Sequence, residues 1–132
     1  MAIHATRLKP GQDLKIALQE FASHKNIRAG WVMSCAGSLT SYCLRFANQQ
    51  SGNAGKGFFE IISLSGTISI DGCHLHIAIA DGNGVLKGGH LLEGCIVYTT
   101  AEIIVGESHD LVFTRGYDDK TGWNELQIKK IE

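Results

Sequence analysis

The sequence contains no run of apolar residues that approaches the roughly 18 needed for a membrane-spanning helix. Proline occurs once, and charged residues make up only 19% of the chain. Met1–Arg7 lacks a basic start followed by an apolar segment, so we expect no signal peptide. At 132 residues, 44% of them hydrophobic, the chain is long enough for a core of its own. We therefore expect a single domain spanning residues 1–132, located in the cytoplasm.

Cysteine pairs with metal-binding spacing are also absent. The sequence has four cysteines, none in a C-x-x-C arrangement, and all four lie in apolar stretches: Cys35, Cys43, Cys73 and Cys95. Cysteine often behaves as a small buried hydrophobic residue, and a chain without an export signal is expected to keep it reduced. We predict structural, reduced thiols and no four-thiolate metal site.

Excess positive charge is missing as well. Twelve Lys and Arg stand against thirteen Asp and Glu, and the only adjacent basic pair is Lys129–Lys130. Proteins that bind nucleic acid usually carry a basic stripe, because neutralising phosphates supplies most of the non-specific affinity. The single chain has no such stripe, although an oligomer could gather several charges on one surface.

The hydrophobic pattern predicts one helix followed by six or seven strands. Leu14, Ala17, Leu18, Phe21 and Ala22 have the spacing of one buried helical face, which predicts a helix over residues 12–25. The predicted strands cover residues 27–36, 41–48, 58–70, 73–80, 91–105, 111–116 and 125–131. Gly37–Ser38 is expected to be a turn, Gln49–Gly57 a polar loop, and Gly66 a bulge or kink. This order indicates an α+β fold with a central antiparallel or mixed sheet and one main helix.

Three histidines give the sharpest chemical signal. His74 and His76 share one face of the predicted strand, while Leu75 and Ile77 lie on the opposite, apolar face. If the Gly-rich turn after this strand is centred near Asn83, residues whose numbers sum to 166 pair, and His76 lies opposite His90. Three imidazoles would then converge, which is the ligand set of an open zinc site with a vacant position. The alternative is that these rings are hydrogen-bonded to the sheet backbone or to an interface.

The segment from Cys95 to Val105 is informative about assembly. Its apolar residues occur at both parities, whereas a strand with one solvent-facing side alternates. With only one clear helix available as a cover, we expect the second face to be covered by another subunit of a closed, symmetric homo-oligomer.

Several segments, in order, resemble the plants and prokaryotes conserved (PPC) domain, and together they span nearly the whole chain. These segments are Arg7–Leu14, Ile27–Gly30, Ser34–Leu39, Phe59–Thr67, His74–His76, Gly88–Gly94 and Tyr98–Glu102.

The resemblance implies an antiparallel α+β domain that assembles as a homotrimer. It also implies a likeness in fold to acetolactate decarboxylases, enzymes with a three-histidine zinc, and His74, His76 and His90 match the family positions suited to a metal. Plant relatives join the domain to AT-hooks with Arg-Gly-Arg-Pro cores, and this chain has none. Their Gly-Arg-Phe-Glu-Ile-Leu segment, tied to partner recognition, corresponds here to Gly57–Ile62, with Phe58 replacing the arginine.

Two classes of function remain open. The family label favours a DNA-binding or regulatory protein, whereas the histidines favour a zinc-dependent enzyme or a small-molecule-binding protein. An enzyme also needs a general acid or base, and Glu93 falls on the opposite face of an unbroken strand from His90. Glu102 would lie about 40 Å from His90 in a straight strand. A carboxylate from a neighbouring subunit, Glu102 or Glu60, would be needed.

Overall fold

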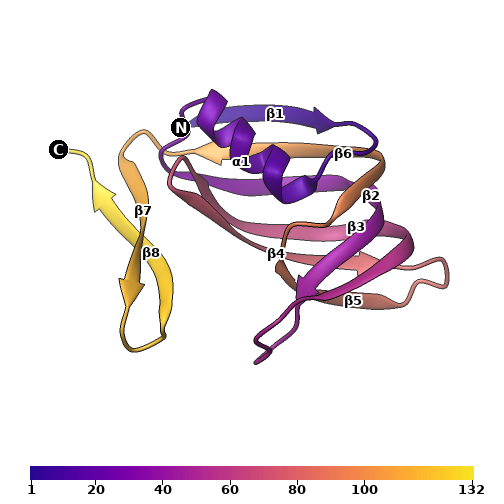
Figure 1. The fold of residues 1–132 in the computed structure, drawn as a ribbon. Helices are drawn as coiled ribbons and strands as arrows, with labels where there is room; N and C mark the ends of the chain where they lie inside the picture. The colour runs from indigo at the N-terminus through magenta and orange to yellow at the C-terminus, as the bar shows by residue number, and fades with distance from the viewer.

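The computed structural model describes all residues 1–132 and contains one helix and eight strands in two antiparallel sheets (Figure 1). The larger sheet has the strand order β1-β6-β2-β3-β4-β5, and β7 and β8 form a separate two-stranded sheet. The elements are β1 (Ala2–Leu8), α1 (Leu14–His24), β2 (Gly30–Arg45), β3 (Asn53–Ser69), β4 (Gly72–Ala80), β5 (Leu86–Leu91), β6 (Ile96–Glu107), β7 (Leu111–Asp118) and β8 (Trp123–Lys130). No helix is long and apolar enough to cross a membrane.

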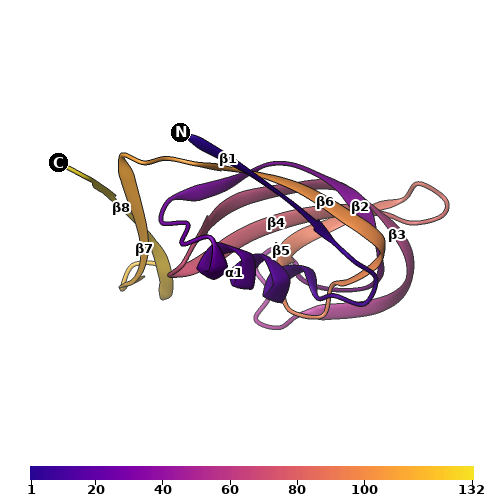
Figure 2. The ribbon, with the colours of Figure 1, turned by 90° about the horizontal axis from the view of Figure 1, so that it is seen from above.

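Helix α1 lies against one face of the larger sheet and closes the hydrophobic core (Figure 2). Leu14 and Leu18 are fully buried there, as the helical spacing predicted. Asp13 is the N-cap residue: its Oδ1 accepts a hydrogen bond from the Ile16 N–H at 3.1 Å, and its Oδ2 accepts one from the Gly94 N–H at 2.7 Å. One carboxylate therefore caps the helix and fastens it to the turn between β5 and β6.

The end of β2 closes the sheet on itself. Most of β2 pairs with β6 and β3, but its last residues pair with β5, so that Leu44 lies opposite Leu91 and Arg45 opposite His90. Because β5 also pairs with β4, it lies between β4 and the end of β2, two strands that are separated only by β3 in the strand order. This closure brings Arg45 beside the histidine strands.

The α+β fold with one main helix is confirmed, and so are the elements that carry the strongest patterns. The helix begins and ends within two residues of the predicted bounds. The predicted histidine strand corresponds to β4, and the two C-terminal strands form the β7–β8 hairpin. The sheet is antiparallel throughout, so the mixed alternative does not apply.

Two predictions near the N-terminus were wrong. Strand β1 was not predicted, although it pairs with β6 over its whole length at the edge of the sheet. The predicted turn at Gly37–Ser38 lies inside the continuous strand β2. Gly37 is needed there for close packing, because a methyl group at its Cα would collide with the backbone of Thr100 and Ala101 on β6.

Three further predictions need correction. The Gln49–Gly57 loop is shorter than predicted, because β3 begins at Asn53, which pairs with Leu44. The predicted strand 91–105 is interrupted, because the backbone turns through Gly94 at φ +111° between β5 and β6. The register between β3 and β4 shifts between Ile61 and Ser63, so Gly66 is not the bulge; it pairs in register with Leu75 at φ +135°.

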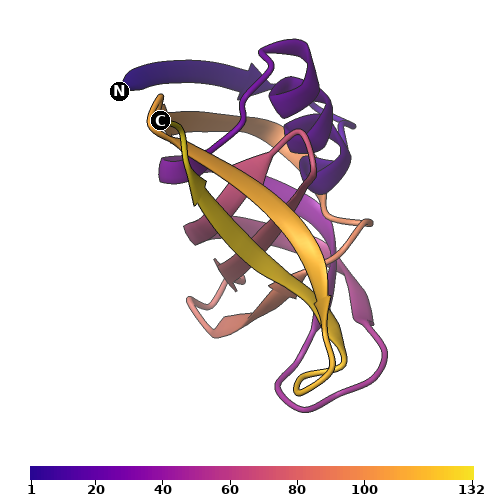
Figure 3. The same cartoon turned by 90° about the vertical axis from the view of Figure 1, so that its left-hand side faces the viewer.

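The β7–β8 hairpin stands across the end of the larger sheet (Figure 3). Three hydrogen bonds dock β7: the Phe113 N–H donates to the Arg28 carbonyl at 2.9 Å, Ser69 Oγ donates to the Phe113 carbonyl at 3.2 Å, and the Arg115 N–H donates to Asp71 Oδ2 at 2.7 Å. The hairpin is therefore fixed beside the turn that joins β3 to β4. That position places its side chains next to the histidine strand.

Candidate metal centre

The three histidines lie together on the outer face of the sheet. His74 and His76 are on β4, and their side chains point outward because Leu75 and Ile77 between and beside them are buried in the core. His90 is on β5, directly opposite His76 in the register that was predicted from a turn centred on Asn83. Strand alternation and strand pairing, both readable from the sequence, are what bring the rings to one place.

The ring geometry is compatible with three ligands around one ion. One nitrogen from each ring can be chosen so that all three lie within 4.8 Å of one another. The Nε2 atoms of His74 and His76 are 3.2 Å apart, close to the separation of about 3.4 Å expected for two nitrogens bound to a tetrahedral zinc at about 2.1 Å. The third ring is inclined toward both, with its centroid 5.0 Å from that of His74 and 5.8 Å from that of His76.

The electrostatic surroundings favour neutral imidazole at two of the positions. Partial burial, followed by the nearby His76 and Arg115, lowers the pKa of His74 below its ordinary value. Partial burial, followed by the positive charge of Arg45, lowers the pKa of His90 to about 4. A metal binds the neutral ring, so these two rings are already in the ligand form near neutral pH.

One nitrogen of the cluster is left without a partner by the protein. Nδ1 of His90 is buried and forms no hydrogen bond, and it is the only buried side-chain nitrogen or oxygen in the chain of which this is true. Buried polar atoms are nearly always paired, so an unpaired one calls for an explanation such as a bound ion or water. The donor set and this unpaired atom together fit a metal ion.

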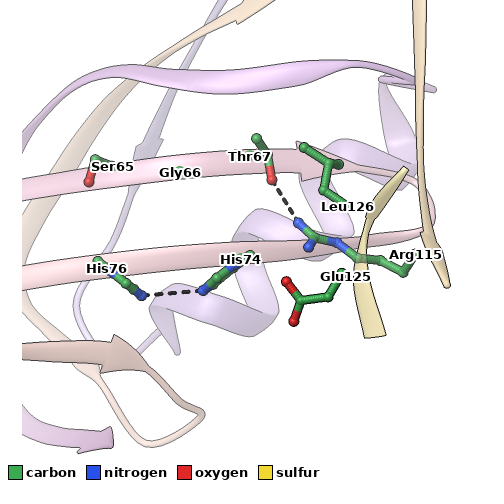
Figure 4. Close-up of a pocket in the computed structure, with 8 residues that line it drawn as sticks. All are labelled: Ser65, Gly66, Thr67, His74, His76, Arg115, Glu125 and Leu126. Carbon is green, nitrogen blue, oxygen red and sulfur yellow. Dashed lines mark hydrogen bonds between the residues drawn. The ribbon is translucent and has the colours of Figure 1, made fainter. Parts of the chain in front are cut away.

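The hairpin supplies two charged side chains beside the histidines (Figure 4). Arg115 on β7 donates a hydrogen bond from Nη2 to Thr67 Oγ1 at 2.7 Å, which holds its guanidinium over β3. Glu125 on β8 points toward His74, and its charge acts to raise the pKa of that ring, against the larger lowering effects. These residues and His76 line an open hollow of about 280 Å³.

Arg45 closes the other side of the cluster. It pairs with His90 in the strand ladder, and its guanidinium carbon lies 4.4 Å from the centre of the Trp123 ring on β8. This cation–π contact holds the arginine between the two sheets. A second hollow, shared with His74 and Glu125, opens between Arg45 and Arg115.

Sequence reasoning found the three histidines but missed the residues around them. Four other strands carry these neighbours, and the roles of the neighbours depend on where the hairpin docks: Arg45, Thr67, Arg115, Trp123 and Glu125. The two strands of the hairpin were predicted. Nothing in the sequence pattern indicated the end of the sheet to which it attaches.

The acidic residues considered earlier lie elsewhere in this chain. Glu60 and Glu102 line a common hollow with Phe58 and Tyr98, a set that contains none of the three histidines. The four cysteines are free, in agreement with the expectation of unpaired thiols. Burial raises the pKa of Cys95 to about 11, so this thiol stays protonated near neutral pH.

The sequence matches a family model, that of the Plants and Prokaryotes Conserved (PCC) domain, over residues 1–109. The β7–β8 hairpin lies beyond the matched region. A curated relative, the "Bifunctional protein GlmU" of Synechococcus sp. (strain JA-3-3Ab), is 44% identical over 131 residues, which is 99% of this chain and 21% of that protein. The chain thus spans about a fifth of the length of that relative.

Solved structures share the fold over nearly the full length, hairpin included. A hypothetical protein from Salmonella is 42% identical with a TM-score of 0.94, covering 98% of this chain and 94% of that one. A protein from Bacteroides thetaiotaomicron named "putative DNA binding protein" is 25% identical with a TM-score of 0.84, covering 95% and 91%. A metal-containing protein from Archaeoglobus fulgidus is 26% identical with a TM-score of 0.78, covering 96% and 94%.

Proposed function

This chain belongs to the Plants and Prokaryotes Conserved domain family, and we propose that it is a zinc-binding domain whose three-histidine centre binds or transforms a small molecule. His74, His76 and His90 are the proposed zinc ligands. The observation that carries the proposal is the convergence of the three rings, whose ligand nitrogens lie within 4.8 Å of one another, and it is joined by the buried, unpaired Nδ1 of His90. The metal-containing relative from Archaeoglobus fulgidus supports it.

Zinc held by three histidines would keep one coordination position open. In such sites the ion acts as a Lewis acid toward a bound carbonyl or water. The group that sequence analysis lacked, an acid or base from the same chain, is supplied by Glu125, whose carboxylate faces His74 (Figure 4). This pairing favours a zinc-dependent enzyme or small-molecule-binding protein, the role suggested by the resemblance in fold to acetolactate decarboxylase.

Zinc content tests the proposal directly. Tag-free protein is stripped with a chelator, titrated with zinc, and assayed by elemental analysis after desalting and by native mass spectrometry. We expect one zinc per chain in the unaltered protein and none retained by His76→Ala. His109→Ala is the matched control, because His109 is an exposed histidine outside the cluster. Failure of the unaltered protein to bind zinc near neutral pH would overturn the proposal.

We also propose that the chain assembles as a homotrimer. Large apolar side chains are exposed on four adjacent strands of the larger sheet, and a surface of this kind typifies a protein interface. These residues are Ile3, Tyr98, Met33, Phe58 and Ile62. Analytical ultracentrifugation is expected to give three times the 14.3 kDa chain mass, and a smaller species for Phe58→Lys. A monomeric unaltered protein would exclude the trimer.

A second candidate, a DNA-binding or regulatory role in the cytoplasm, is favoured by the relative from Bacteroides thetaiotaomicron named for DNA binding. The net charge of −1 gives it little support from a single chain. A DNA-binding oligomer should lose affinity steeply as salt rises from about 50 to 200 mM, because phosphate contacts release counterions. Electrophoretic mobility shifts with duplex DNA measure this. Absence of a shift at low salt would leave only the small-molecule function.

A further inference from the structure

Two arginine side chains face the histidine cluster without a carboxylate partner. The only ion pair within 4.0 Å in the whole chain joins His4 to Glu107, on a different part of the sheet. Arg115 is bound to a threonine hydroxyl and Arg45 to an aromatic ring, both of them uncharged. Arginines on a protein surface are commonly paired with a nearby carboxylate. Their charges are instead left available beside the cluster.

The guanidinium of Arg115 is held in place and still has free donors. Its Nη2 donates to Thr67 Oγ1 at 2.7 Å, and its backbone N–H donates to Asp71 at 2.7 Å, so both ends of the residue are fixed. A guanidinium has five N–H groups, and this one uses a single one within the protein. The fork geometry of the others suits a carboxylate or a phosphate, which accept two parallel hydrogen bonds.

The second charged group of the hollow, the carboxylate of Glu125, requires a hydrogen-bond donor from the ligand. Glu125 enters the hollow from the hairpin side, as Arg115 does, with its carboxylate directed toward His74, and it forms no hydrogen bond or ion pair through that carboxylate (Figure 4). An ionised carboxylate only accepts hydrogen bonds, so a ligand that contacts it must offer an O–H or N–H. The hollow measures about 280 Å³, which is slightly below the range of about 300–1,000 Å³ typical of sites for drug-sized ligands.

From this arrangement we propose that the hollow beside the histidines is the binding site of a small hydroxylated oxyanion. Arg115 binds the carboxylate or phosphate, Glu125 accepts a hydrogen bond from the hydroxyl, and the ligand extends toward the metal position at the histidines. Thr67 is a positioning residue, because it acts by holding Arg115. The inference rests on the proposed zinc centre and names the class of ligand that this centre receives.

The hairpin has a specific role in this proposal. Arg115 and Glu125 both lie beyond residue 109, where the match to the family model ends, whereas the histidines lie within it. The part of the chain outside the family match therefore supplies two of the charged side chains that border the histidines, and the third, Arg45, comes from within the match. In this proposal the hairpin residues Arg115 and Glu125 select the class of ligand, and the histidines of the larger sheet hold the metal.

Ligand-observed NMR titrations of the zinc-loaded protein test the proposal with four probes. Lactate and glycerol phosphate carry the two kinds of oxyanion together with a hydroxyl. Lactamide lacks the negative charge, and propionate lacks the hydroxyl. We expect lactate, glycerol phosphate or both to bind, and lactamide and propionate to bind at least about tenfold more weakly, as for loss of a charge-assisted hydrogen bond. The stronger of the two hydroxylated anions identifies the source of the oxyanion.

Variants then assign the binding to the named residues. Arg115→Gln should weaken anion binding by about tenfold or more. Thr67→Val should weaken it by a smaller factor, because the Arg115 charge remains but its guanidinium loses the hydrogen bond that holds it in place. Arg28→Gln is the control: Arg28 is an exposed arginine whose side chain forms no hydrogen bond, and its backbone also contacts the hairpin. Circular dichroism and zinc content are measured on every variant, and Thr67→Val serves if Arg115→Gln does not fold.

The outcomes separate the two proposals. A protein that binds no zinc overturns the metal centre, and the anion titrations are then repeated on the zinc-free protein to show whether Arg115 binds anions by itself. A protein that binds zinc but neither anion overturns the present inference alone. Equal anion binding by the unaltered protein and Arg115→Gln overturns it as well, as does binding of lactamide that equals that of lactate.

Discussion

Replacement of Gly66 by alanine is a test of how the backbone supports the histidine strand. Gly66 on β3 pairs with Leu75, and its φ of +135° is one that side chains rarely adopt. A methyl group built on its Cα would overlap the carbonyl oxygen of His74 and would lie only 3.0 Å from the Leu75 Cα. Gly66→Ala must therefore either change the local backbone of β3 or push β4 away.

Two costs contribute to the loss of stability. Holding a non-glycine residue in this conformation costs on the order of 1–3 kcal/mol. Displacing the ladder near His74 weakens one or two strand hydrogen bonds, each with a net value of about 1 kcal/mol. The sum is about 2–5 kcal/mol, and for a chain of this length each kcal/mol lowers Tm by about 3–4 °C. We therefore expect Tm to fall by roughly 6–20 °C.

Thermal and urea denaturation of zinc-free protein measure this change, and zinc titration shows whether displacement of His74 also weakens metal binding. Gly82→Ala is the matched control, because Gly82 lies in the turn after β4 and a methyl group there meets nothing within 4 Å. Its Tm should stay within about 2 °C of the original, as for a neutral surface change. If Gly66→Ala is as stable as Gly82→Ala and binds zinc equally well, the argument for a required close approach is wrong.

Three other outcomes are expected. The pKa of His90 falls from an ordinary value near 6.5 to about 4 on folding, so the unfolded chain binds this proton more tightly than the folded chain does. Zinc-free protein should therefore lose stability as pH drops from about 6.5 to 4. Thermal melts measure this, and the Tm of His90→Gln should depend less on pH over that range. Asp13→Ala removes the helix cap and the acceptor of the Gly94 N–H, and should cost about 1–2 kcal/mol or slightly more in urea titrations. Ile103→Ala creates a cavity at a fully buried position and should cost about 2–5 kcal/mol, whereas Val85→Ala, at 61% exposure, should change the unfolding free energy by less than about 0.5 kcal/mol.

The histidine cluster was predictable because it depends on local rules. Alternation along β4 sets the direction of His74 and His76, and the turn centred on Asn83 sets the partner of His76. Both follow from a few adjacent residues. The same holds for α1, whose buried face repeats at helical spacing and whose start is marked by Asp13.

The missed elements depend on partners that are distant in the chain. In β1, Ala2, His4 and Thr6 face inward, and such a weakly apolar face gives little strand signal even though β6 pairs with all of it. Gly37 and Gly66 suggested a turn and a bulge, whereas each allows a neighbouring strand to approach closely. The sequence does not distinguish a glycine that forms a turn or bulge from one that allows a close approach between strands. Only the position of the neighbouring strand does so.

The surroundings of the histidines were beyond sequence reasoning for a related reason. Arg45 reaches His90 because the end of β2 bends across to pair with β5. Arg115 and Glu125 arrive because backbone N–H groups of the hairpin donate hydrogen bonds to the Arg28 carbonyl and the Asp71 carboxylate, and these contacts carry no pattern in the sequence. The sequence shows that the last strands contain charged residues, but it does not show which residues of the larger sheet they face.

Because the hairpin docks as a separate sheet, the residues that orient the imidazoles and the hairpin residues that border them belong to different parts of the fold. Strand pairing in the large sheet fixes the three imidazoles, and it involves none of the residues of β7 or β8. Substitutions in the short hairpin can therefore reverse or remove the charges that border the imidazoles and leave the ladder that orients them intact. Members of one family can in this way keep the same arrangement of imidazoles while sequence changes in the C-terminal hairpin alter which ligands can bind beside them.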